Sequence, residues 1–85
     1  MHYVVYILED QKDKTWYIGF TTNLAERLRD HIKKRSPYTS KKKDLKLIYA
    51  ELYLNKQDAL GREKFLKSGA GHRFIKKQLK NYFER

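Results

Sequence analysis

Two short runs near the N-terminus are apolar on both faces, and they constrain the fold more than any other feature. The runs are YVVYILE at residues 3–9 and TWYIGF at residues 15–20, and both are rich in β-branched and aromatic side chains. Such residues favour β-strands, and the polar stretch DQKDK between the runs suits the loop of an antiparallel hairpin. Because both faces are apolar, we expect this hairpin to lie in a sheet that is covered on both sides.

A helix is expected directly after the hairpin, over residues 24–35. Apolar side chains recur there every fourth residue, which is the spacing of one helix face. Thr22 or Asn23 can cap its start, and Glu26 stands three residues after Asn23 as in a capping box. The helix should end near Pro37, because the residue before a proline is pushed out of the helical region.

The second half of the chain adds one strand and two helices. Residues 45–54, LKLIYAELYL, form a third strand-like run. Residues 56–68 and 72–85 carry apolar side chains at helical spacing, and the pair Gly69 and Gly71 between them is expected to end the first helix. The order strand, strand, helix, strand, helix, helix predicts an α/β (α+β) fold with a three-stranded, largely antiparallel sheet flanked by helices.

Composition limits how such a chain is organised and stabilised. The 85 residues contain no internal repeat and no Gly/Ser linker, so one domain over residues 1–85 is expected. Without cysteine there is no disulfide, no thiolate metal site and no thiol nucleophile. The N-terminus lacks the pattern of a signal peptide, and no apolar run approaches the roughly 20 residues of a membrane span. A cytoplasmic protein with no membrane association is therefore expected.

The charge favours an anionic partner. The chain has 20 Lys and Arg against 10 Asp and Glu, which leaves a formal net charge of +10. Nucleic acid is the leading partner for such a field, an anionic membrane surface is a weaker one, and a solvated basic surface is the alternative. Candidate phosphate contacts form two groups, of which the first suits a solvated loop equally well: Tyr38, Thr39, Lys41, Lys42 and Lys43, and then Arg73, Lys76 and Lys77.

Gly19 is unexpected among the strand formers of the second run. Side chains alternate across a strand, so Tyr17 and Gly19 share one face while the bulkier apolar residues share the other. A glycine inside a strand often marks the close approach of a ligand or of another backbone. Tyr6 of the first run borders the same gap if the hairpin register allows. The alternative is a pair of core tyrosines beside a bulge glycine.

Three polar side chains fall on helix faces that should be buried. Arg27 and His31 border the apolar stripe of the first helix, one turn apart, and Glu63 lies in the middle of the stripe of the second helix. A carboxylate in such a position must be paired or bind a cation. One interpretation is structural, with Glu63 paired to Arg27 or Lys67 and His31 satisfied in the core. The other is functional, with Arg27 gripping phosphate oxygens and Glu63 binding Mg²⁺.

These features form an ordered set over nearly the whole chain: VVY at 4–6, YIG at 17–19, Arg27 with His31 four residues later, Glu63, and KSGAGHRF at 67–74. The set resembles the signature of the GIY-YIG nuclease superfamily, in particular its small single-domain members of the UPF0213 type. The resemblance implies a three-stranded antiparallel sheet flanked by helices. It also implies hydrolysis of a phosphodiester, with DNA as the favoured substrate and Mg²⁺, or another divalent cation such as Mn²⁺, as cofactor.

The resemblance further implies a role for each motif residue. Tyr17, or Tyr6 beside it, helps to activate or orient the attacking water, and Arg27 stabilises charge on the phosphate. Glu63 holds the single metal ion, and His31 orients the reactants or shares in proton transfer. A phenol with a pKa of about 10 is a poor base at neutral pH unless nearby cations lower its pKa, and Arg27 and the metal ion are candidates for that.

Two departures from the family pattern bear on function. Val4 stands where the first motif usually has glycine, and the further polar residue of the last helix, for which Gln78 and Asn81 are candidates, has no clear counterpart. Members with known substrates usually carry a second, targeting domain, so little sequence specificity and a targeting partner protein are expected. A role in repair or recombination would fit. A non-catalytic nucleic-acid-binding module and a recruitment domain of a larger DNA-processing complex stay open as alternatives.

Overall fold

The structure is a computed structural model that describes residues 2–33 and 44–84, with only the backbone described for Ile32 and Lys33. Within these ranges three strands form one antiparallel sheet in the order β2-β1-β3: β1 (Tyr3–Asp10), β2 (Trp16–Thr21) and β3 (Leu45–Tyr53). Four helices follow or intervene: α1 (Leu24–Lys33), α2 (Lys56–Leu66), α3 (Gly69–Gln78) and α4 (Lys80–Phe83). The predicted fold class and the antiparallel hairpin are confirmed. No helix in the described part of the chain is long and apolar enough to cross a membrane.

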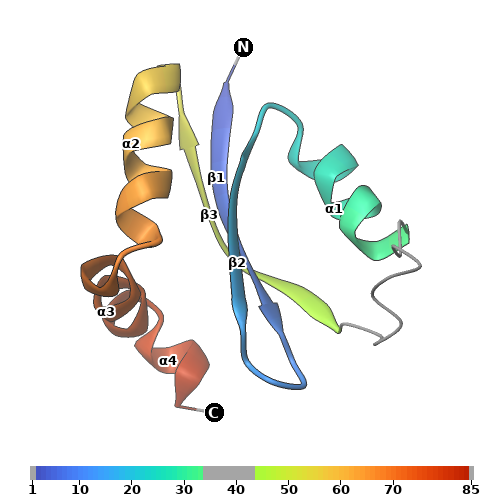
Figure 1. Ribbon diagram of the computed structural model, residues 1–85, viewed down its shortest axis with the longest axis vertical. Helices are drawn as coiled ribbons and strands as arrows, with labels where there is room; N and C mark the ends of the chain where they lie inside the picture. Colours follow the sequence, from blue (N-terminus) through green and yellow to red (C-terminus); the bar gives the residue numbers. More distant parts are fainter. Residues whose placement is uncertain (1, 34–43, 85) are drawn as a thin grey trace.

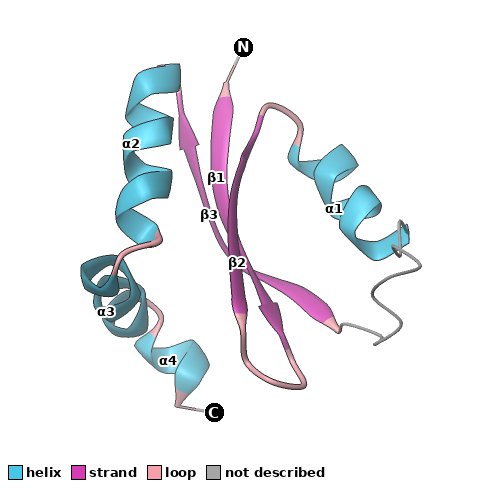
Figure 2. Cartoon of the chain, viewed as in Figure 1, coloured by secondary structure: helices cyan, strands magenta, loops and turns pink. Residues whose placement is uncertain are grey.

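The sheet lies between two helical layers, α1 on one side and α2, α3 and α4 on the other (Figures 1 and 2). The main core forms on the α2 side, where Val5 and Ile7 of β1 pack with Ala59, Leu66 and Ile75. All of β1 from its second residue onward is buried on both faces, as expected for the central strand. The prediction of a covered sheet is thus confirmed for β1.

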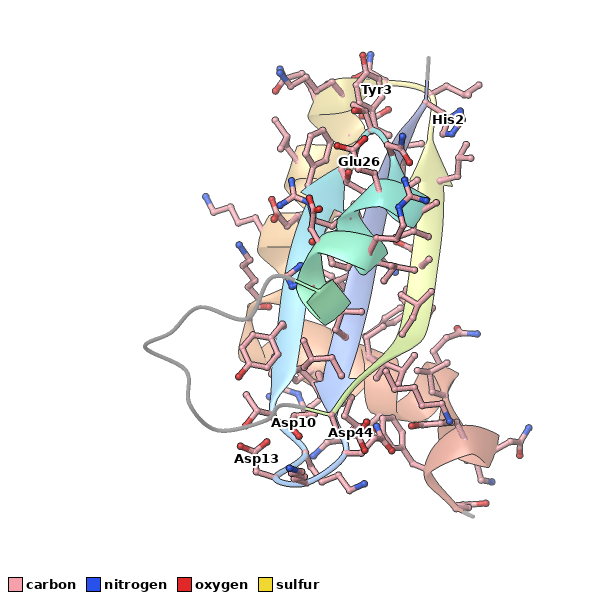
Figure 3. All side chains as sticks on the ribbon, turned by 90° about the vertical axis from the view of Figure 1, so that its right-hand side faces the viewer. His2, Tyr3, Asp10, Asp13, Glu26 and Asp44 are labelled. Carbon is pink, nitrogen blue, oxygen red and sulfur yellow. The ribbon has the colours of Figure 1, made fainter. Side chains whose placement is uncertain are left out.

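Cover on the α1 side is incomplete at the β3 edge. The α1 helix lies in front of the sheet when it is viewed from that side (Figure 3). Leu52 of β3 is nevertheless 58% exposed, whereas Val4, its partner in the β1–β3 register, is buried. The α1 layer therefore covers the central strand and leaves part of β3 open to solvent.

Local side-chain hydrogen bonds fix the β1–β2 turn and the start of α1. In the β1–β2 turn, Asp10 accepts the backbone N–H of Lys12 and Asp13 accepts that of Thr15, each at 2.9 Å; both aspartates lie at one end of the sheet (Figure 3). At the start of α1, the Asn23 side chain accepts the N–H of Glu26 at 3.1 Å. The predicted Asn23 cap is confirmed, although the Glu26 carboxylate accepts from the Asn23 side-chain amide rather than from its backbone.

The prediction that Gly69 and Gly71 end the second helix is wrong. The α2 helix ends at Leu66, and both glycines lie in the first turn of α3, whose N-cap Ser68 accepts the N–H of Gly71 at 3.1 Å. A Cβ at position 71 would overlap the backbone of Phe65 and Leu66. Gly71 is therefore required for the close approach of two helices, whereas the sequence alone suggested a helix terminator.

The prediction of one helix over residues 72–85 is also wrong, because the chain turns at Leu79 between α3 and α4. The N–H of Leu79 still bonds to the carbonyl of Ile75 at 2.8 Å, so α3 is completed before the turn. The new direction brings the Tyr82 hydroxyl within 3.1 Å of Glu9 and stacks Phe83 on Trp16. These long-range contacts outweigh the local preference for a continuous helix.

Hydrogen bonds to the Glu51 carboxylate link β3 to α2. We call Tyr49, Glu51, Tyr53 and Arg62 the Glu51 cluster; it is saturated, because four hydrogen bonds fill the acceptor positions of the carboxylate. Arg62 donates to both Glu51 oxygens at 2.8 and 3.1 Å, and Tyr53 and Tyr49 donate to one oxygen each. The guanidinium also lies over the Phe74 ring, 4.4 Å from its centroid. Burial raises the pKa of Glu51, but these donated hydrogen bonds more than offset it and hold the pKa below its ordinary value.

Candidate active site

The Tyr6 phenol lies across Gly19. The two residues are directly paired in the β1–β2 register, and a Cβ at position 19 would overlap the Tyr6 hydroxyl and ring. The register runs without a shift from Val4–Thr21 to Glu9–Trp16, so the interpretation of Gly19 as a bulge glycine is wrong. Gly19 is a site of close approach, and the approaching group is the Tyr6 side chain, which extends toward the open edge of the sheet at β2.

A cavity of about 440 Å³ opens at this edge. Tyr6 and Tyr17 line it from the α1 face of the hairpin, as predicted from the alternation of side chains. Trp16 and Ile18, from the opposite face of β2, line it as well, so the cavity wraps around the edge strand. Three side chains from the helical layers complete the lining: His31, Lys67 and His72.

His31 reaches the sheet from α1, but the residue is exposed, so the interpretation of a histidine satisfied in the core is wrong. Its Nε2 atom lies 3.4 Å from the Tyr6 hydroxyl, and the two rings meet edge to face with centroids 6.2 Å apart. Burial raises the pKa of Tyr6 above 10.0, the Arg27 charge lowers it in part, and the Glu63 charge raises it further. Arg27, one of the two candidates for lowering the pKa of the phenol, therefore does so only in part at Tyr6, because desolvation outweighs its charge.

Glu63 lies on α2 with 20% of its side chain exposed, and its Oε2 atom is 3.4 Å from the Nζ atom of Lys67 one turn later. Of the two structural partners considered, the structure thus selects Lys67 rather than Arg27. Arg27 is exposed on α1, and its charge acts on the Tyr6 phenol. We call Tyr6, Tyr17, His31, Glu63 and Lys67 the β2-edge site.

The β2-edge site suits a cation held by a single carboxylate. Over residues 2–33 and 44–84, no three His, Asp or Glu side chains gather in a group that could hold a metal ion. Mg²⁺ commonly takes only one or two protein carboxylates and fills its other positions with water or phosphate. The Glu63 carboxylate is partly exposed, and its contact with Lys67 within the described residues is long, so its chemistry fits such an ion.

The remaining predicted site residues fall in several places. Lys76 lines a neighbouring cavity, whereas Arg73 and Lys77 are exposed on α3 and line neither cavity. Gln78 and Asn81, the candidates for the further polar residue, are exposed and do not line the β2-edge cavity either. The predicted residues that lie outside the described part of the chain are Tyr38, Thr39, Lys41, Lys42 and Lys43.

Sequence reasoning missed Trp16 and His72, and it considered Lys67 only as a structural partner. Lys67 follows Glu63 by four residues, and this spacing already placed both on one helix face. Trp16 was correctly assigned to the packed face of β2. It was missed because side chains from both faces of an edge strand can line the same cavity. His72 had no local signal beyond its place in the segment KSGAGHRF.

Comparison with known proteins assigns the chain to a family. The model of the GIY-YIG catalytic domain matches residues 2–80. A UPF0213 protein of Streptococcus pneumoniae is 39% identical over 64 residues, which cover 74% of this chain and 64% of the relative. A UPF0213 protein of Clostridium perfringens is 40% identical over 68 residues, 79% of this chain and 71% of the relative. The chain belongs to the GIY-YIG catalytic-domain family and, within it, to the UPF0213 type.

A solved structure agrees with this assignment. The solution structure of the UPF0213 protein BH0048 from Bacillus halodurans is 31% identical, with a TM-score of 0.56 over 88% of this chain and 82% of that one. The chain spans less than two thirds of some curated relatives, for example 58% of YazA from Bacillus subtilis. GIY-YIG domains define a family of nucleases that act on nucleic acid and generally use divalent metal ions.

Proposed function

We propose that this protein is an endonuclease that uses Mg²⁺ or Mn²⁺ to hydrolyse phosphodiester bonds in DNA, with little sequence preference of its own, in repair or recombination. The observation that carries the proposal is the contact between the Tyr6 phenol and the His31 imidazole at an open cavity on the β2 edge of a GIY-YIG chain, with Glu63 outside the lining but near enough for its charge to act on Tyr6. A module that only binds nucleic acid would need its lysines and would not need this arrangement.

The proton of the attacking water passes to His31 in this proposal. The raised pKa of Tyr6 keeps its phenol protonated at neutral pH, so Tyr6 acts as a hydrogen-bond donor rather than as a base. Imidazole is the side chain that ordinarily changes charge near neutral pH, and His31 lies beside Tyr6 at 3.4 Å. Tyr17, on the same wall of the cavity, orients the water.

The negative charge of the reacting phosphate is balanced by Arg27 of α1 and by a cation at Glu63 of α2. The Arg27 guanidinium stabilises the charge that builds up on the phosphate oxygens. Glu63 would hold the divalent cation, which supplies Lewis-acid polarisation of the phosphate and assists the leaving 3′ oxygen. Lys67 keeps the Glu63 carboxylate oriented before the substrate arrives.

Surface charge brings the substrate to the site without selecting its sequence. The formal charge of +10 favours association with a polyanion through counterion release. Arg73, Lys76 and Lys77 on α3 contact the phosphate backbone, and so do the lysines at positions 41–43. Such contacts position DNA rather than specify it, so a partner protein supplies the target.

Cleavage of supercoiled plasmid and of a branched oligonucleotide tests the proposal, with Mg²⁺, with Mn²⁺ and with EDTA. Glu63→Gln keeps the shape of the side chain and removes its charge, so it should lower the nicking rate by about 100-fold or more while DNA affinity stays within about twofold. Glu84→Gln, a change of the same kind at an exposed position on the last turn, is the control and should cleave normally.

An unchanged nicking rate in Glu63→Gln would remove this residue from the metal site. Salt-sensitive binding with no cleavage of either substrate, under any metal condition, would instead favour the non-catalytic binding module.

A further inference from the structure

A second cavity, of about 740 Å³, adjoins the β2-edge site and is larger than a phosphodiester needs. It lies between the β1–β2 turn and the helices α3 and α4, and we call it the turn cavity. Trp16 and His72 line both cavities, so the two spaces share a wall. Its volume is in the range of small-molecule sites. Of the residues that line it, the function proposed above gives a role to Lys76 alone.

Aromatic rings form one wall of the turn cavity. The Trp16 indole meets His72 at a centroid distance of 4.7 Å and is stacked on Phe83 at 5.8 Å with an interplanar angle of 20°. Phe83 is 36% exposed although it is a large apolar residue. Stacked and partly exposed rings are the surfaces on which proteins hold unpaired bases, because every base has an aromatic face.

A buried carboxylate in the lining, bonded to Trp16 of the aromatic wall, argues against a phosphate inside the turn cavity. Glu9 is 3% exposed, and it accepts hydrogen bonds from Trp16 Nε1 at 3.0 Å, Gln11 Nε2 at 3.0 Å and the Tyr82 hydroxyl at 3.1 Å. These donors are neutral, so the negative charge stays and repels an anion.

Cations line the same cavity. Lys14, at the only described non-glycine position with a positive φ, and Lys76 both contribute to the lining. A neutral aromatic ring against Trp16 and Phe83, with the phosphates of the same strand outside the cavity and attracted by these lysines, suits both the aromatic wall and the charges of the cavity. A nucleotide whose base has left the stack has this combination of properties.

We propose that the turn cavity binds one unstacked nucleobase of the substrate, beside the nucleotide whose phosphate enters the β2-edge site. This inference rests on the proposed function for the position of the phosphate. A base inside an intact duplex is paired and stacked on its neighbours, so occupation of the cavity requires a single strand, a flap, a junction or a flipped nucleotide. The preferred substrate is therefore DNA that contains unpaired nucleotides.

Trp16 is the only tryptophan of the chain, so its fluorescence reports directly on this wall of the cavity. The probes are a single-stranded oligothymidylate, an abasic oligonucleotide with the same number of phosphates, and a blunt hairpin duplex, each titrated in EDTA so that no cleavage occurs. The oligothymidylate should quench Trp16 and bind about tenfold more tightly than the abasic strand, which is the effect of one base stacked on an aromatic ring. The abasic strand and the hairpin should bind with little quenching.

A pair of phenylalanine variants locates the effect. Phe83→Ala should reduce the affinity for oligothymidylate by about tenfold, to that of the abasic strand. Phe65→Ala is the matched control, because Phe65 is also 36% exposed but lines neither cavity. Its affinity for oligothymidylate should be unchanged, and thermal melting of both variants verifies that they are folded.

Equal affinity and equal quenching with the oligothymidylate and the abasic strand would overturn the base site in the unaltered protein, whatever the variants do. Plasmid cleavage is scored separately, so the two proposals fail independently. Base-dependent quenching without cleavage on any substrate would reject the nuclease and keep the base site. Cleavage without base-dependent quenching would keep the nuclease and reject the base site.

Discussion

The Glu51 cluster and the β2-edge site contain the same kinds of side chain, and they differ in how tightly these are bonded. Each has a carboxylate, two tyrosines and a basic residue, which follows the carboxylate by eleven positions in the Glu51 cluster and by four in the β2-edge site. In the Glu51 cluster Arg62 approaches the carboxylate to 2.8 Å, whereas in the β2-edge site Lys67 stays 3.4 Å from Glu63.

The two sites also differ in what they face. The acceptor positions of Glu51 are filled by Arg62 and two tyrosines, and the Arg62 guanidinium lies over the Phe74 ring. The β2-edge site opens on a cavity, and its Tyr6–His31 contact is as long as the Glu63–Lys67 contact, at 3.4 Å. A saturated polar cluster stabilises the fold, whereas the partly exposed Glu63 carboxylate, with its long contact to Lys67, is accessible to a cation or a substrate.

The largest expected effect is on the β2-edge site, from Gly19→Ala. The added methyl group would occupy the position of the Tyr6 phenol and displace it from His31. We expect the nicking rate to fall by about 100-fold, the effect of misplacing a catalytic group by about 1 Å. Overpacking should also lower the free energy of unfolding by about 1–3 kcal/mol, as measured by thermal melting.

The double variant Gly19→Ala with Tyr6→Leu separates these two effects. Leucine removes the ring that the new methyl group overlaps, so the free energy of unfolding should recover while the nicking rate stays low. Recovery of the rate as well would show that Tyr6 does not take part in cleavage.

A smaller effect, on stability and not on cleavage, is expected from Glu51→Gln. The change removes the charge that Arg62 and the tyrosines bind, so the free energy of unfolding should fall by about 2 kcal/mol. The nicking rate of the folded protein should stay the same, which is the reverse of the Glu63→Gln result. Loss of nicking at a temperature where this variant is still folded would end the distinction between the two sites.

The sequence predicted the β2-edge site better than the Glu51 cluster. Strand alternation correctly placed Tyr17 and Gly19 on the face of Tyr6, and helix spacing brought His31 to the same side, whereas Arg27 is exposed rather than on a buried face. Gly19 was expected to face a ligand or backbone, and only the register showed that Tyr6 is the group that approaches. Which group fills such a gap depends on a neighbouring strand and cannot be derived from the strand itself.

Long-range partners explain the rest of what was missed. Tyr49, Glu51 and Tyr53 alternate along β3 and so share a face, yet Arg62 joins them from another element. The turn at Leu79 is likewise set by contacts with Glu9 and Trp16, about 70 positions away. Local periodicity carries no information about such pairs, because a helix that bends and a helix that continues have the same spacing of apolar residues.

A more modest effect is expected in the pH dependence of stability, which tests whether the Glu51 cluster stabilises the fold through its charge. The pKa of Glu51 is lower in the folded protein than its ordinary value of 4.5, so the folded state favours the charged form. The contribution of the Glu51 charge to the free energy of unfolding is fully present above pH 4.5 and is lost as the pH falls through the pKa of the folded state. The difference in melting temperature between the unaltered protein and Glu51→Gln should therefore shrink below that pH.

Melting curves from neutral pH downward measure this difference. A gap that stays constant to the lowest pH at which both proteins fold would mean that Glu51 is stabilised by shape and packing rather than by its charge.

The smallest expected effect comes from Gly61→Ala, which is the counterpart of Gly19→Ala. Gly61 is exposed in the middle of α2, and a Cβ there would meet no atom within 4 Å. Alanine should stabilise the helix by about 0.5–1 kcal/mol, because glycine loses more backbone freedom on folding. The nicking rate should not change, although Glu63 lies only two residues further along the same helix.

The two glycines therefore test what the β2-edge site requires. If only the contact between Gly19 and Tyr6 matters, stiffening α2 at Gly61 leaves cleavage intact. If the rate falls in Gly61→Ala while its melting temperature rises, Glu63 must move during the reaction. The 3.4 Å Glu63–Lys67 contact would then describe one position of a mobile carboxylate rather than a prearranged site.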